Sequence, residues 1–178
     1  MLVVRLAGIL VFIIFTFAAS TQAQSVQADF DRSFDFSKLK TFNFAIQRRS
    51  PGDPLAKDTL NDGRIKTALE SKLTASGYRR ETAQKPDFAI AYYITTRNKV
   101  DVQDNSFGPR RWFGGRDIRV DQYTEGTLIV DLIDPNTKQL IWRGRASGSV
   151  ELKDADKKID KAVEKLVKQF IKDTTAKK

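Results

Sequence analysis

The sequence predicts an α+β domain, in which a mostly antiparallel sheet of about five or six strands carries two helices on one face as a two-layer sandwich. The segment Glu125 to Gly148 has the pattern of two strands joined by a tight turn. Two other segments, Thr59 to Ser76 and Asp154 to Asp173, carry apolar residues at helical spacing. Because an antiparallel sheet with one apolar face needs cover, the apolar stripes of these helices are expected to pack on it.

The two strands within Glu125 to Gly148 show a period of two. Their even positions, from Leu128 to Ala146, are apolar or small, and their odd positions include Thr127, Asp131 and Arg143. Successive side chains of a strand leave the backbone on opposite faces, so one face of this hairpin is core and the other is at least partly wet. Residues 134–137, DPNT, suit a type I turn because Asp bonds the backbone ahead and Pro fixes the next φ.

Three further strands are predicted, over Val26 to Asp31, Thr41 to Ile46 and Asp87 to Arg97. In the third, every second residue from Phe88 to Ile94 is a large apolar or aromatic residue, which predicts a place deep in the sheet. The link between the first two strands contains three apolar residues that we expect under the sheet edge: Phe34, Phe36 and Leu39.

The first predicted helix begins at Thr59, and Asp62 three residues later matches a capping box. Gly77 is a natural stop for it. The last helix begins at Asp154 and combines an apolar stripe with a face rich in lysine. Such a helix can lie on a membrane, but packing on the sheet is the favoured alternative.

The stretch from Asn98 to Tyr123 is the least regular part of the chain. A compact domain seldom keeps more than about 15 structureless residues without a use for them. We expect its ends, Lys99 to Asp104 and Asp117 to Tyr123, to extend the neighbouring strands as a ribbon. An irregular basic and aromatic loop is expected over residues 104–119.

The first 23 residues form a separate unit. Arg5 precedes an apolar run from Leu6 to Phe17, and small and polar residues follow to Ala23. This pattern predicts a secretory signal peptide cleaved after Ala23. A retained membrane anchor is the alternative, although the apolar run is shorter than the ~20 residues that span a bilayer. Residues 24–178 then form a single domain, exported to the periplasm or associated with the cell envelope.

Composition excludes several kinds of chemistry. The chain has 31 Lys and Arg against 22 Asp and Glu, a formal charge of +9, which becomes +8 once residues 1–23 are removed. It has no Cys and no His, which removes disulfides, thiolates, the common general base and the commonest metal ligand. We expect no cofactor and no metal. The basic surface can meet anionic lipid headgroups or acidic polymers, or it can simply be solvated.

Short motifs occur in a recognisable order along the chain. They are Asp31 with Phe36, Lys40-Thr41-Phe42, Arg64-Ile65, Leu73, Gly77-Tyr78, Pro86-Asp87, Glu125-Gly126-Thr127-Leu128, Asp131, Asp134 and Trp142-Arg143-Gly144. This order resembles a bacterial family, domain of unknown function family 4136 (DUF4136), many of whose members are envelope lipoproteins. The resemblance covers essentially all of residues 24–178, implies an exported α+β domain, and implies no activity. The chain lacks the lipobox Cys of the lipoprotein members, so the resemblance does not extend to a lipid anchor.

An acid pair on the hairpin is the candidate for a carboxylate-based hydrolase acting on an envelope polymer. Asp131 and Asp134 point to opposite faces of a regular strand because their separation is odd. Glu125 and Asp131 share a face but lie about 20 Å apart along a strand, whereas glycosidase carboxylates need roughly 5 to 10 Å. The other interpretation is that Asp131 pairs across the strands with a base such as Arg143 and Asp134 shapes the turn. We therefore expect that the protein is not an enzyme, and we keep the carboxylate-based hydrolase as the alternative.

The second candidate site is the basic and aromatic loop, formed by Arg110, Arg111, Trp112, Phe113, Arg116 and Arg119. Arginine suits phosphate or carboxylate, and the neighbouring aromatic rings can lie on sugar or lipid. Export and the absence of a recognised motif argue against nucleic acid. The alternative is that the aromatic rings fold back over the sheet edge while the arginines are solvated.

These patterns together favour a non-catalytic binding or structural module. Its partner would be an anionic envelope surface or an envelope protein, met through the arginine loop and the lysine face of the last helix.

Overall fold

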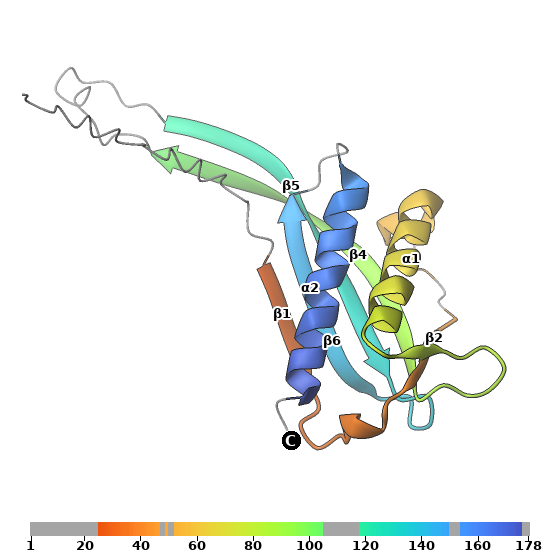
Figure 1. Ribbon diagram of the computed structural model, residues 1–178. Coiled ribbons are helices and arrows are strands. Elements are labelled where there is room, and N and C mark those ends of the chain that lie inside the picture. Colours follow the sequence, from red (N-terminus) through yellow and green to blue (C-terminus); the bar gives the residue numbers. More distant parts are fainter. Residues whose placement is uncertain (1–24, 47–48, 50–51, 105–117, 150–153, 176–178) are drawn as a thin grey trace, which may run out of the picture.

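The computed structural model describes residues 25–46, 49, 52–104, 118–149 and 154–175, and it has an α+β fold (Figure 1). The strands are β1 (Ser25–Phe30), β2 (Thr41–Phe44), β3 (Arg79–Arg80), β4 (Phe88–Asp104), β5 (Ile118–Ile133) and β6 (Leu140–Ser149). The helices are α1 (Thr59–Ala75) and α2 (Ala155–Thr175), with short 3-10 turns at Phe36–Lys38 and Pro54–Ala56. Within this described part, neither helix is long and apolar enough to cross a membrane.

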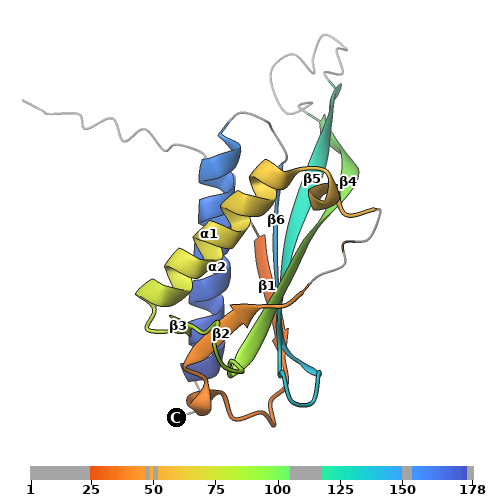
Figure 2. The ribbon, with the colours of Figure 1, turned by 90° about the vertical axis from the view of Figure 1, so that its right-hand side faces the viewer.

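The strands form one six-stranded mixed sheet in the order β1-β6-β5-β4-β2-β3, and both helices lie on the same face of it (Figure 2). The predicted hairpin is confirmed, because β5 and β6 pair antiparallel with Leu132 opposite Trp142. The expectation of a mostly antiparallel sheet holds from β1 to β4 but is wrong at the other edge, where β2 pairs parallel with both β3 and β4. The reason is the connection: α1 lies between β2 and β3 in the chain, and a crossover helix of this kind returns the chain in the same direction.

The turn between β5 and β6 follows the predicted chemistry. Asp134 accepts the Asn136 amide on one carboxylate oxygen (2.8 Å) and the Thr137 hydroxyl on the other (2.9 Å). The hydrogen bond from the Asn136 backbone amide lowers the pKa of Asp134 below its ordinary value. Lys138 completes the turn in the left-handed region, with φ 63°.

Helix α1 begins at Thr59 as predicted, but the predicted capping box is wrong. The cap is Asp58, whose carboxylate accepts the Asn61 amide (3.0 Å). Asp62 instead turns its carboxylate toward Arg49 and Tyr92. Gly77 ends the region with φ 95°, the left-handed conformation that glycine adopts without strain.

The core lies between the sheet and the two helices. Trp142, 1% exposed, lies in contact with Phe170 of α2, and its indole N–H donates to Asp173 (3.0 Å). Gly144 makes room for the Trp142 ring: a Cβ there would lie 2.2 Å from Trp142 Cη2 and 2.7 Å from Leu166 Cδ2. The apolar stripe of α2 is therefore buried on the sheet. This confirms the favoured prediction for this helix, which was packing on the sheet.

An aspartate joins β2 to the start of β4. Asp87 accepts the backbone amides of Lys40 (2.9 Å) and Thr41 (2.8 Å), together with the Thr41 hydroxyl (2.9 Å). These contacts give the Lys40-Thr41 and Pro86-Asp87 motifs a structural role.

Beyond the rest of the sheet, β4 and β5 continue as the expected two-stranded ribbon (Figure 1). Their pairing reaches Asp104 opposite Ile118.

Candidate functional site

The predicted arginine loop is only partly within the described residues. Arg110, Arg111, Trp112, Phe113 and Arg116 lie outside them. Arg119 is in β5, where it pairs with Gln103 of β4. The signal segment, residues 1–23, also lies outside.

The described residues instead form a polar groove on the sheet face that is turned away from the helices. This open-face groove has a volume of about 520 Å³. It is lined by Ser25, Gln27, Thr95, Thr96, Arg97, Lys99, Glu125, Thr127, Ile129, Arg145 and Ser147. Sequence alternation predicted that the face formed by the odd positions of β5 and β6 would be at least partly wet, but not that these positions would join residues of β1 and β4 in one site.

A row of four hydroxyls crosses the open-face groove. The strand register places Ser25, Ser147, Thr127 and Thr95 side by side on β1, β6, β5 and β4. The Thr127 and Ser147 hydroxyl oxygens are 2.8 Å apart and share a hydrogen bond. Each hydroxyl both donates and accepts, so the row can bind the hydroxyl or phosphate oxygens of a ligand.

Two arginines flank this row. Arg97 of β4 lies on one side of it and Arg145 of β6 on the other, and both are exposed. Neither forms an ion pair with another described residue. Lys99, in contrast, pairs with Glu125 (2.8 Å). The groove thus presents three cations against one acid, and its two guanidinium groups suit phosphate or carboxylate.

The acids considered for hydrolysis are held in structural pairs. Asp131 is 7% exposed, and its two oxygens accept Arg143 Nε and Arg143 Nη2, each at 2.6 Å. The bond to Asp131 raises the pKa of Arg143 above its ordinary value. Glu125 is occupied by Lys99, and regular strand pairing separates it from Asp131. The interpretation that Asp131 pairs with Arg143 and Asp134 shapes the turn is confirmed.

Among the described residues, no three carboxylates are grouped closely enough to hold a metal ion. The remaining residues of the motifs named in the sequence analysis contribute to the fold. Trp142 and Gly144 belong to the core, and Gly126 lies opposite Gly148 on the face toward the helices.

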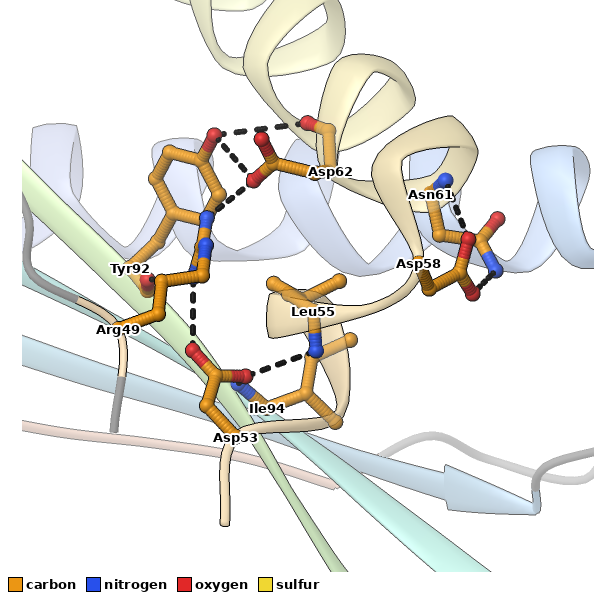
Figure 3. A network of polar contacts seen from close by, with 8 residues as sticks. All are labelled: Arg49, Asp53, Leu55, Asp58, Asn61, Asp62, Tyr92 and Ile94. Carbon is orange, nitrogen blue, oxygen red and sulfur yellow. Dashed lines mark hydrogen bonds and ion pairs between the residues drawn. The ribbon is translucent and has the colours of Figure 1, made fainter. Parts of the chain in front are cut away.

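A second polar cluster, which the sequence patterns did not predict, centres on Arg49 (Figure 3). Its guanidinium donates to Asp53 (2.7 Å), to Asp62 and to the Tyr92 carbonyl (3.2 Å), and it lies 5.1 Å from the centre of the Tyr92 ring. Burial lowers the pKa of Arg49, but the bond to Asp53 and the charge of Asp62 outweigh it and raise the pKa. Asp53 also accepts the Leu55 amide (3.0 Å). This Arg49 cluster fastens the segment before α1 to both α1 and β4, so it acts as a structural latch.

The Arg49 cluster makes folding sensitive to alkaline pH through Tyr92. Burial, together with the Asp62 carboxylate that accepts its hydroxyl (2.9 Å), raises the pKa of Tyr92 far above its ordinary value. Near pH ~10 the unfolded chain loses this proton while the folded chain keeps it, so stability is present below that pH and falls as pH rises. Denaturant unfolding of the wild type and of Tyr92→Phe between about pH 9 and 11 should show a steeper loss for the wild type. Parallel losses would contradict this assignment.

A solved structure of another protein shares the fold at low sequence identity. A search of curated proteins found no match. A PDZ domain protein from Parabacteroides distasonis ATCC 8503 has a similar fold, with a TM-score of 0.55 at 15% identity, over 82% of this chain and 35% of that one. This chain therefore corresponds to about a third of that protein's length. A PelC dodecamer from Paraburkholderia phytofirmans is similar at a TM-score of 0.43 and 12% identity, over 82% of this chain and 95% of that one. The family model "Domain of unknown function (DUF4136)" matches residues 26–170, so this chain belongs to the DUF4136 family.

Proposed function

We propose that this protein is an exported, non-catalytic binding module whose open-face groove binds anionic, hydroxyl-bearing groups of the cell-envelope surface. One observation carries the proposal: Arg97 and Arg145, both exposed and neither forming an ion pair with a described residue, flank a row of four hydroxyls.

The ligand chemistry follows from this arrangement. A guanidinium group presents planar donors that match two oxygens of a phosphate or carboxylate. Hydroxyl side chains complement the hydroxyls of a sugar or glycerol. Ile129, 8% exposed and opposite Arg145 in the strand register, adds an apolar side chain to the lining of the groove. A phosphoglycerol headgroup or an acidic sugar combines the required features.

Export and overall charge support the same proposal. Residues 1–23 have the parts of a signal peptide, and the remaining chain carries a formal charge of +8. A net positive charge draws a protein toward anionic surfaces. The arginines among residues 110–119 would add to this attraction.

Vesicle flotation tests the proposal. The chain beginning at Gln24 is mixed with vesicles of phosphatidylcholine alone or with added phosphatidylglycerol, across a salt series. We expect flotation only with the anionic vesicles, and release as the Debye length falls from ~10 Å at 0.1 M salt to ~3 Å at 1 M. A protein that never floats would contradict binding to a phosphoglycerol headgroup.

A further inference from the structure

An apolar hollow lies on the other face of the sheet, between β5, β6 and the first turns of the two helices. Its volume is about 140 Å³. The buried side chains of Ile65, Leu128, Ala146 and Ala162 form its floor, and the half-buried Ile94 and Ile159 form part of its rim. The hollow is therefore closed at its base and reaches solvent at the helix N-termini.

Small residues create this hollow. Gly126 and Gly148 are paired across β5 and β6, and both line it. Among the described glycines only Gly77 has a positive φ, so the backbone does not require glycine at either position. Ala146 and Ala162 are also small. Protein interiors are normally close-packed, and unfilled apolar volume lowers stability, so a hollow kept open by four small residues needs a reason.

We propose that the apolar hollow binds the end of an unbranched alkyl chain of about six carbon atoms. The size fits, because a protein cavity of about 150 Å³ holds a benzene molecule. The shape of the ligand follows from the lining: none of the described lining residues is aromatic, so a ring would find no stacking partner, whereas a flexible chain can follow aliphatic walls. Asn61 and Lys158 at the rim leave the polar end of the ligand beside water. This site lies on the opposite face from the open-face groove and does not depend on it.

A chain-length series gives the site a distinct signature. Calorimetric titration of the chain beginning at Gln24, which contains every described element, would use the straight-chain alcohols from propanol to decanol. Affinity should rise roughly fourfold with each methylene group while the hollow fills, and it should level off beyond about six carbons. Benzene should bind more weakly than hexanol. Affinity that keeps rising to decanol would indicate adsorption to an open surface and would overturn the proposal, as would no binding of hexanol.

Filling the hollow provides the control. Ala162→Leu should weaken hexanol binding at least tenfold, because the added carbons occupy the ligand's volume. Ala75→Leu makes the same change at an exposed position of α1 and should leave the affinity unchanged. Ala155→Leu, at the mouth of the hollow, carries the same test if Ala162→Leu does not fold. Equal binding by the filled variants and the wild type would overturn the proposal.

Discussion

Replacing Arg49 by Ala is expected to lower the free energy of unfolding by about 3 kcal/mol, because it leaves a buried carboxylate without its counter-charge. Arg49 is 16% exposed in its side chain, and its partner Asp53 is 7% exposed. The substitution also removes the hydrogen bonds that Arg49 donates to the Tyr92 carbonyl and to the Asp62 carboxylate. Denaturant unfolding of the variant and the wild type measures the difference.

Two further variants make the Arg49 result specific. Arg32→Ala removes the same side chain from an exposed position and should change stability by less than about 0.5 kcal/mol. In the double variant Arg49→Ala/Asp53→Ala, the loss should be smaller than the sum of the two single losses, because the buried charge is gone as well. A loss below about 1 kcal/mol in Arg49→Ala would show that the cluster is solvated and is not a buried latch.

Replacing Arg143 by Ala is expected to cost about 2 to 3 kcal/mol for the same physical reason. Its two parallel hydrogen bonds to Asp131 join the central strands β5 and β6. Because Asp131 is only 7% exposed, water cannot readily replace these bonds. Arg145→Ala is a matched control, since it lies two residues away on the same face of β6 but is exposed. Its effect should stay within about 0.5 kcal/mol.

The Asp131–Arg143 pair also bears on the hydrolase alternative, which would need Asp131 for catalysis. If Asp131 serves only the fold, then Asp131→Asn should reduce stability and leave anionic vesicle binding intact in the folded fraction. A variant that is as stable as the wild type would contradict the structural role of the Asp131–Arg143 pair.

Local periodicity was sufficient to predict much of the fold. The alternation around Leu128 and Trp142 predicted the hairpin, and the spacing from Ile159 to Phe170 predicted α2 and its buried face, because each pattern lies within one element. The parallel edge at β2 was not predictable in this way. Its direction depends on how α1 crosses the sheet, and no pattern within residues 41–44 reports that.

The candidate site was less predictable for a related reason. Arg97 and Arg145 are 48 positions apart in the sequence, and only the register of β4, β5 and β6 brings them to opposite sides of one hydroxyl row. A period of two assigns each residue to a face but does not say which residue of another strand lies beside it. The Arg49 cluster was missed because its segment has loop composition, and its partners Asp62 and Tyr92 come from later elements.

The central claim is that the open-face groove, and not the basic surface in general, meets the anionic ligand. The most direct test compares two double variants that each remove two exposed positive charges, from opposite faces of the sheet. Arg97→Ser/Arg145→Ser changes the groove, and Lys161→Ser/Lys172→Ser changes the outer face of α2.

Both variants would be measured by flotation with vesicles containing phosphatidylglycerol at a single salt concentration. We predict that the groove variant loses at least tenfold in affinity, a difference of about 1.4 kcal/mol, while the α2 variant stays close to the wild type. Equal losses in the two variants would contradict the account, because they would mean that net charge alone governs binding.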